Sequence, residues 1–333
     1  MPAKNRTALI LAAVILIAAA GAGLWYFSRP KEKTSIIVST TTSLYETGFL
    51  DAIKKNFEAK YPEITVDFIS QGTGQAIQTA KDGNADLILV HDPKSEKPFL
   101  TDGYGVNRKI VAYNFFIAVG PSADPAGIKG LGPVDALKKI AAAGVAGNAV
   151  WVSRGDNSGT HSKEKSLWAL TGLSLDALKA QKAPNGQPWY IEAGASMTAT
   201  LQLADQKNAY TLSDVGSFLK NSATGTIELV KLVDSGKELI NVYSAIACNP
   251  AKNPRGRSEQ AMTFVRYLAG DEGQTLFASY GVSDYGQTLF KPWAPLLKSG
   301  SDPAMVQLVK DYAYIDDSDC PDAYQLNPGD LYK

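Results

Sequence analysis

The sequence predicts an α/β protein that is built from two lobes. Just after the N-terminal segment, three short apolar runs alternate with helical patterns, at residues 35–40, 64–70 and 86–90. This alternation is typical of a doubly wound, mostly parallel sheet. Two longer β-rich runs, residues 109–119 and 241–247, end at Gly-Pro and close to Asn-Pro pairs. We interpret them as strands that carry the chain into a second lobe and back.

The composition is that of a folded protein with a sizeable core. The chain has 333 residues, of which 45% are hydrophobic and 20% are charged. Its 33 basic and 33 acidic residues balance, so a basic surface for nucleic acid is not expected. Binding of an anion would therefore depend on a local site.

The N-terminus predicts export. Lys4 and Arg6 precede an uncharged apolar run over residues 7–27, which is typical of a signal peptide or of a membrane anchor. Small residues inside the run fit a cleavage site, whereas its bulky end favours an anchor, so both alternatives stay open. In both cases the folded part lies outside the cytoplasmic membrane, where a disulfide between Cys248 and Cys320 is an expectation that spacing alone does not establish.

The most distinctive stretch is residues 153–161, Ser-Arg-Gly-Asp-Asn-Ser-Gly-Thr-His. It follows an apolar run at 148–152 and precedes a helical pattern at 162–170. A strand, a glycine-bearing loop and a helix start together point backbone N–H groups at one spot, and the helix dipole adds positive potential. Arg154 adds a fixed charge. A capped helix start with Arg154 paired to Asp156 explains this stretch equally well, so the two interpretations stay open at this point.

Two first-lobe strands end in loops of the same design. Thr-Thr-Thr-Ser at residues 40–43 and Gln-Gly-Thr-Gly at 71–74 each open a predicted helix, as Ser196 does further on. Loops at the carboxyl edge of a parallel sheet are where open α/β folds bind ligands, although each loop could also be a simple helix cap. Neutral N–H and O–H donors with one arginine suit a small inorganic oxyanion, which lobe closure would shield from water.

Catalytic motifs are scarce. The only histidines are His91 and His161, and the sequence has no P-loop and no Gly-x-Ser-x-Gly elbow around Ser158. We therefore expect His161 to be structural and His91 to shape the turn after its strand. A membrane-anchored hydrolase or transferase using Asp156 and Asp214 is a remote alternative, because nothing supplies its base or its metal.

Taken together, five stretches resemble the periplasmic tungstate-binding proteins (TupA type) of ABC transporters, within the two-lobed substrate-binding superfamily. The resemblance covers about residues 35 to 280. The matching stretches are residues 40–43, 85–93, 111–121, 153–161 and 210–214.

The resemblance implies a two-lobed periplasmic-binding-protein fold of type II, with two crossing strands at the hinge. Residues 1–34 would be the signal peptide or anchor with its linker. Lobe 1 would comprise residues 35–118 and part of 243–333, and lobe 2 would comprise 119–242. The last region would also hold a C-terminal extension.

The resemblance also implies a ligand and a site. The ligand would be tungstate or molybdate, with no cofactor, no metal centre and no catalysis, and a monomer would deliver it to the permease of an ABC importer. Arg154 and Thr160 would hold the oxyanion from lobe 2. The remaining expected contacts, from lobe 1 and from a further helix start, are Thr41, Thr42 or Ser43, then Gly72, Thr73, Ser196 and Met197.

Phosphate-binding proteins of the same superfamily, which use a similar loop, are the runner-up. In that alternative Asp156 would accept a proton from hydrogen phosphate, whereas for unprotonated tungstate it must be turned away or paired with Arg154. This sequence departs from the commoner tungstate pattern after Asp214, where residues 215–217 contain no arginine. The tail beyond residue 285 does not align.

Overall fold

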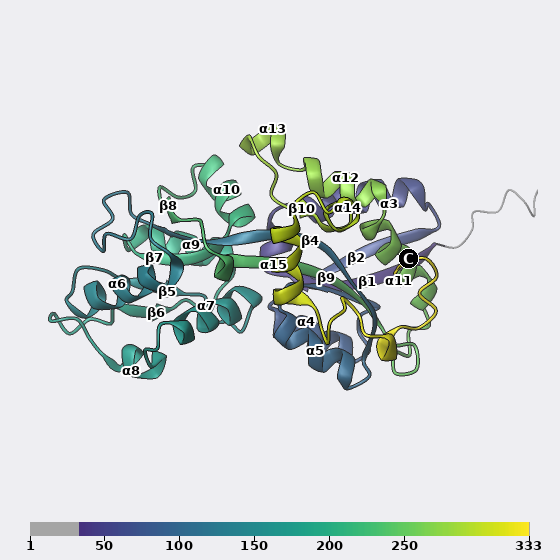
Figure 1. The fold of residues 1–333 in the computed structure, drawn as a ribbon, viewed down its shortest axis with the longest axis horizontal. Coiled ribbons are helices and arrows are strands. Elements are labelled where there is room, and N and C mark those ends of the chain that lie inside the picture. The colour runs from purple at the N-terminus through teal and green to yellow at the C-terminus, as the bar shows by residue number, and fades with distance from the viewer. Residues whose placement is uncertain (1–32, 333) are drawn as a thin grey trace, which may run out of the picture.

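The computed structural model describes residues 33–332 and shows two lobes side by side, joined by long strands (Figure 1). Ten strands form one continuous sheet, in the order β2-β1-β3-β9-β4-β7-β5-β6, with β8 and β10 paired to β4. Strands β1, β2 and β3 are parallel, as are β5, β6 and β7, whereas the pairs that involve β4 or β9 are antiparallel. The expected doubly wound, mostly parallel arrangement is thus found in each lobe.

The first lobe alternates strands and helices as the sequence predicts. Its second part follows β9. The elements are β1 (Thr34–Thr41), α2 (Thr42–Glu46), α3 (Phe49–Lys60), β2 (Ile64–Gln71), α4 (Thr73–Lys81), β3 (Leu87–Val90), α5 (Pro93–Thr101), α11 (Ser258–Ala269), α12 (Asp271–Ser279), α13 (Val282–Tyr285) and β10 (Lys291–Pro292).

The second lobe has shorter strands. The elements are α6 (Pro133–Val145), β5 (Trp151–Ser153), α7 (Gly159–Leu170), α8 (Leu175–Ala180), β6 (Tyr190–Glu192), α9 (Met197–Gln206), β7 (Tyr210–Asp214), α10 (Val215–Ala223), β8 (Val230–Val233) and the 3-10 turn η1 (Lys237–Leu239).

Two strands cross between the lobes. β4 (Gly105–Gly120) pairs with β9 (Ile240–Cys248) over its first part and with β7 from Phe116 onward. They are the two longest strands among residues 33–332, and both are buried along almost their whole length. They therefore place the carboxyl-edge loops of the two lobes against one another.

The sheet is covered on both faces. In β3, Leu87 and Leu89 pack with α3 and α11, whereas Ile88 and Val90 pack with α4 and α5. This period of two follows from the alternation of side chains along a strand. The second lobe is layered in the same way, with α6 and α7 on one face and α9 and α10 on the other.

One predicted helix is divided. The pattern over residues 44–60 predicts a single helix, but the structure has α2 and α3 with a turn between them. Gly48 has φ +79°, which favours glycine. Thr47 Oγ1 donates to the carbonyl of Leu44 at 2.7 Å and accepts from Phe49 N at 3.2 Å. The hydroxyl of Thr47 thus competes with the helical hydrogen bonds, and α2 ends there.

The C-terminal segment lies over the crossing strands (Figure 1). Val309 and Ala313 pack against Ile110 and Val242 of β4 and β9. Its elements are α14 (Trp293–Ser299), α15 (Pro303–Ala313) and the 3-10 turn η2 (Asp322–Tyr324).

Within residues 33–332, no helix is long and apolar enough to cross a membrane. The predicted signal peptide or anchor lies outside the described residues. Cys248 and Cys320 are both buried and both free, so the expected disulfide is absent from the described chain.

A buried ion pair at the start of β4 should be a large contributor to the integrity of the first lobe. Arg108 Nε and Nη2 lie 2.9 and 2.8 Å from Glu96 Oε2, and both side chains are fully buried. Arg108→Met should lower the free energy of unfolding by about 3–5 kcal/mol, because it leaves Glu96 buried without its partner. Urea unfolding measures this change.

The matched control is Lys231→Met, which removes an exposed ion pair with Asp234 and should cost less than about 1 kcal/mol. Equal and small changes in both variants would contradict the importance of the buried pair.

Candidate functional site

The loop between β5 and α7 is built to expose backbone N–H groups. Gly155 and Asn157 have φ +62° and +57°, and the backbone therefore turns sharply twice before α7 begins. Gly155 also lies against β6, where a Cβ atom would come within 2.7 Å of Glu192 Cβ. Ser158 caps α7 by accepting from His161 N at 3.2 Å. Only glycine fits at position 155.

Arg154 is the charged centre of this loop. It is 1% exposed, although it lies in a loop. Its Nη2 donates to a carboxylate oxygen of Asp156 and to Thr42 Oγ1, the latter at 3.3 Å. Its Nε and Nη1 have no partner among the described residues. Two nitrogens of a buried guanidinium, with three N–H groups, are therefore free to donate to a ligand.

Asp156 is fully engaged inside the loop. One of its carboxylate oxygens accepts from Arg154, and the other accepts from Ser158 N at 3.1 Å. The predicted pairing of Arg154 with Asp156 is thus present, and it coexists with free N–H groups on Arg154.

Glu164 of α7 holds the end of β5 in place. Its carboxylate accepts from Ser153 Oγ at 2.8 Å, Trp151 Nε1 at 2.8 Å and Tyr190 OH at 2.6 Å. Burial raises the pKa of Glu164, and the hydrogen bonds oppose that shift. Sequence reasoning missed this residue, since an acid between Lys163 and Lys165 gives the pattern of an exposed helix face.

The β1–α2 loop meets Arg154 from the first lobe. Thr42 accepts the hydrogen bond from Arg154, whereas Thr41 caps α2 by accepting from Leu44 N at 3.4 Å. Ser43 lies 3.3 Å from His91 Nε2, measured from its Oγ. Of the three expected hydroxyls, Thr42 is therefore the one with a contact across the cleft.

The β2–α4 loop lies against the same second-lobe loop. A Cβ atom on Gly72 would lie 3.4 Å from the carbonyl oxygen of Asp156, so the two loops are in close contact. Thr73 begins α4 and is buried, and its Oγ1 has no partner among the described residues. The same holds for Thr160 Oγ1 in the first turn of α7. Two helix N-termini, one from each lobe, thus carry unpaired buried hydroxyls and adjoin the loop that holds Arg154.

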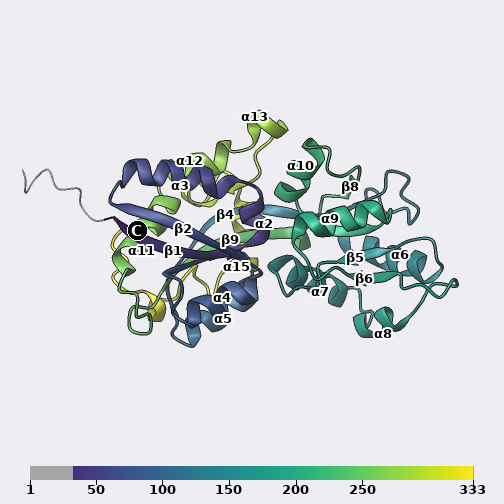
Figure 2. The ribbon, with the colours of Figure 1, turned by 180° about the vertical axis from the view of Figure 1, so that it is seen from behind.

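The α9 start is placed differently. Ser196 caps its own helix by accepting from Ala199 N at 3.4 Å, and the Met197 side chain is buried in the second-lobe core. The neighbouring Thr198 donates from N and Oγ1 to Glu46 of α2, at 3.2 and 2.9 Å. Viewed from behind, α2 and α9 lie next to each other across the two lobes (Figure 2). The hydroxyl of Ser196 accepts in this cap and keeps its own proton to donate, whereas the Met197 side chain is turned into the core and leaves only its backbone N–H.

His91 lies at the interface of the lobes. Its Nδ1 lies 2.8 Å from Asn241 Oδ1 of β9, and a Cβ atom on Gly159 would lie 2.8 Å from its Cε1. Burial lowers the pKa of His91 to about 4. The ring is therefore neutral and packs under the start of α7.

Asp214 has a structural role at the start of α10. Its Oδ1 accepts from Ser217 N at 2.9 Å, and burial raises its pKa. In the described part of the chain, no group of three or more His, Cys, Asp or Glu side chains could hold a metal ion.

The comparisons with known proteins now identify the family. The model of the PBP superfamily domain matches residues 28–272. Over 282 residues the chain is 38% identical to the tungstate-binding protein TupA of Peptoclostridium acidaminophilum, covering 82% of this chain and 93% of the relative. The chain belongs to the TupA-type family of substrate-binding proteins. The resemblance seen in the sequence is thereby confirmed.

Solved structures agree with this membership. The tungstate-binding protein TupA from Desulfovibrio alaskensis G20 aligns with a TM-score of 0.63 at 37% identity, over 78% of this chain and 99% of that one. The tungstate ABC transporter protein from Geobacter sulfurreducens aligns with a TM-score of 0.65 at 39% identity, over 74% and 98%. The two-lobed α/β fold is thus that of TupA.

The buried His91 makes stability depend on pH. Its folded-state pKa of about 4 lies below the ordinary 6.5, so the unfolded chain takes up the proton first as pH falls. Stability contributed by neutral His91 is present above pH 6.5 and is lost towards pH 4, by up to about 3 kcal/mol. Urea unfolding at a series of pH values measures this loss.

The comparison is with His91→Gln, which keeps a polar side chain but cannot titrate. The variant should show a shallower decline over the same range, while the loss from carboxylates remains common to both proteins. Identical pH profiles of the two proteins would contradict the assignment of this loss of stability to His91.

Proposed function

We propose that this TupA-type protein is an extracytoplasmic solute-binding protein that captures tungstate, and also molybdate, between its lobes and delivers it to an ABC importer. The observation that carries the proposal is the fully buried Arg154. Arg154 contacts Thr42 of the other lobe and keeps two nitrogens without a partner among the described residues, and the helix starts that adjoin its loop carry unpaired hydroxyls. A tetrahedral dianion satisfies such donors and neutralises the guanidinium.

The proposed binding residues come from both lobes. Hydrogen bonds to a charged group contribute roughly 1.5–3 kcal/mol each, so several together reach the approximately 12 kcal/mol of nanomolar binding. The residues are Arg154, Thr160, Thr73 and Thr42 through side chains, Gly72 and Met197 through backbone N–H groups, and Thr41, Ser43 and Ser196 as neighbouring donors.

Asp156 supports tungstate over phosphate. Unprotonated tungstate offers only acceptors, whereas hydrogen phosphate also needs an acceptor for its proton. Both carboxylate oxygens of Asp156 are already occupied, by Arg154 and by Ser158 N. The pairing of Asp156 with Arg154 is the arrangement expected beside an unprotonated ligand, and this supports tungstate.

Partner and location follow from the family. Substrate-binding proteins of this type work with an ABC permease outside the cytoplasmic membrane, and the N-terminal apolar run predicts the required export. We propose that the chain acts as a monomer and without catalysis.

The oxyanion test is a thermal shift series. The purified protein is heated alone and with tungstate, molybdate, sulfate or phosphate, and stabilisation should follow RT ln(1 + [L]/Kd). Tungstate and molybdate should raise Tm strongly, and phosphate should raise it little. Arg154→Ala should weaken tungstate binding at least about a hundredfold, whereas the exposed Arg266→Ala should leave it unchanged. A Tm that no oxyanion raises would refute the proposal.

The two unpaired hydroxyls can be tested separately. Thr160→Val and Thr73→Val keep the side-chain shape but remove a donor, so each should weaken tungstate binding about tenfold or more. Isothermal titration calorimetry measures Kd. The control Thr263→Val removes a helix-surface hydroxyl that donates to Glu259 O, and its Kd should equal that of the wild type. Unchanged affinity in both cleft variants would show that tungstate does not bind at Thr73 and Thr160.

A further inference from the structure

The C-terminal segment, residues 293–332, lies outside the part that the family model matches, because that match ends at residue 272. Helix α15 of this segment lies across the crossing strands, at the junction of the two lobes (Figure 1). Relative motion of the lobes would therefore change the contacts of α15.

The segment is anchored to the first lobe. Arg108 of β4 donates from Nη1 to the carbonyl oxygen of Asp319 at 2.7 Å, and Lys109 Nζ lies 3.1 Å from Asp319 Oδ2. Lys97 of α5 pairs with Asp316 at 2.9 Å. These contacts involve the first-lobe part of β4 and a first-lobe helix. The segment should therefore move with lobe 1.

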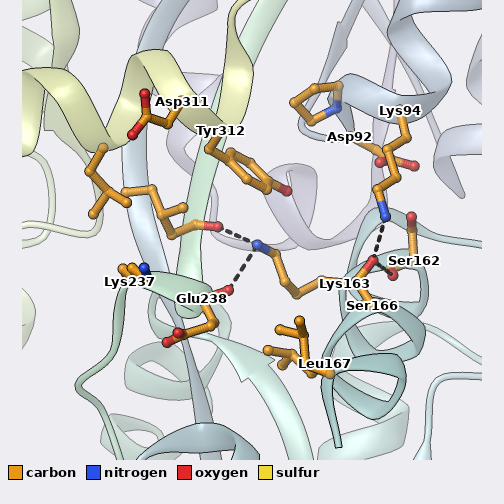
Figure 3. A pocket seen from close by; sticks show the side chains of 14 residues that line it. Asp92, Lys94, Ser162, Lys163, Ser166, Leu167, Lys237, Glu238, Asp311 and Tyr312 are labelled. Carbon is orange, nitrogen blue, oxygen red and sulfur yellow. Dashed lines mark hydrogen bonds between the residues drawn. The ribbon is translucent and has the colours of Figure 1, made fainter. Parts of the chain in front are cut away.

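One residue of the segment reaches a helix of the second lobe. Lys163 Nζ of α7 lies 3.9 Å from the centre of the Tyr312 ring, within the range of a cation–π interaction. The same ammonium donates to the carbonyl oxygens of Glu238 and Ile240, at 3.0 and 2.7 Å, which fix its position (Figure 3). Both side chains line a cavity of about 470 Å³ at the junction of the lobes.

The helix that Tyr312 contacts is the helix that opens the anion site. Lys163 is one turn beyond Thr160, and α7 directly follows the loop that carries Arg154. A second contact lies beside it, since Lys94 Nζ of α5 donates to Ser166 Oγ of α7 at 2.9 Å. Helix α7 is thus attached to the first lobe by two contacts. One is between Lys163 and Tyr312 of the C-terminal segment, and the other is between Ser166 and Lys94 of α5.

We propose that Tyr312 is a positioning residue for ligand binding, and that the C-terminal segment is a latch that favours the closed arrangement of the lobes through Lys163. This role rests on the proposed oxyanion binding. In the structure, the latch coexists with contacts that span the cleft, such as those of Arg154 with Thr42 and of Thr198 with Glu46.

The latch acts by shifting a population. Because the segment is anchored to lobe 1 and Lys163 belongs to lobe 2, opening of the cleft separates Tyr312 from Lys163. A contact made only in the closed state raises the closed fraction of the free protein. The apparent ligand affinity rises with that fraction, without any contact between Tyr312 and the ligand.

The test compares Tyr312→Leu with Tyr314→Leu, whose ring faces Lys310 of the same segment rather than the second lobe. Burial lowers the pKa of Lys163 to about 7, so binding is measured near pH 6, where the ammonium is charged. Tyr312→Leu should weaken tungstate binding about tenfold, mainly through faster dissociation. Tyr314→Leu should bind like the wild type. In combination with Lys163→Met, the effect of Tyr312→Leu should disappear.

A readout without ligand separates the latch from the proposed function. Lys55→Cys in α3 and Ala177→Cys in α8 are exposed positions for a fluorescence-transfer dye pair, and both native thiols are buried. Tyr312→Leu should lower transfer efficiency in the free protein, and Tyr314→Leu should not. Unchanged transfer and Kd in Tyr312→Leu would overturn the latch. Failure of the wild type to bind tungstate would instead refute the proposed function, and the dye pair would still test the latch.

Discussion

The structure depends on one electrostatic constraint, a guanidinium that is buried where the two lobes meet. Arg154 is 1% exposed and is paired on one side only, by Asp156. A buried charge with unsatisfied N–H groups is costly unless a partner of opposite charge completes it. In the proposed site, an oxyanion in the cleft would meet this requirement with donors from both lobes around it. We infer that the burial of Arg154 links anion binding to lobe closure.

Among the described residues around Arg154, the acids are held in hydrogen bonds of their own and the histidine is uncharged. His91 is kept neutral by burial, and the first-lobe loops contribute hydroxyl and amide groups. Glu164 is a buried acid nearby, but its oxygens are occupied by Trp151, Ser153 and Tyr190, so it anchors the loop. The chain as a whole is balanced in charge, so attraction of an anion would depend on this local arrangement.

The local structure around the candidate site could be predicted from the sequence pattern. The strand, glycine loop and helix start around Arg154 and Thr160 could be read directly, as could the loops at Thr42 and Gly72. Glu164 could not be predicted, because its burial results from packing between α7 and β5. The turn at Gly48 divides an expected helix. The hydroxyl of Thr47 forms hydrogen bonds with the backbone there that replace those of a continuous helix, and the apolar periodicity does not reveal this. The placement of Tyr312 depends on tertiary contacts of a tail that has no recognisable motif.

The most direct measurement is anomalous X-ray diffraction from crystals grown with tungstate, at the tungsten L-III edge. One strong peak is expected within hydrogen-bond distance of Arg154, Thr73 and Thr160, in a protein whose lobes are closed. A peak at another site, or crystals that contain no bound tungsten at saturating tungstate, would contradict this expectation.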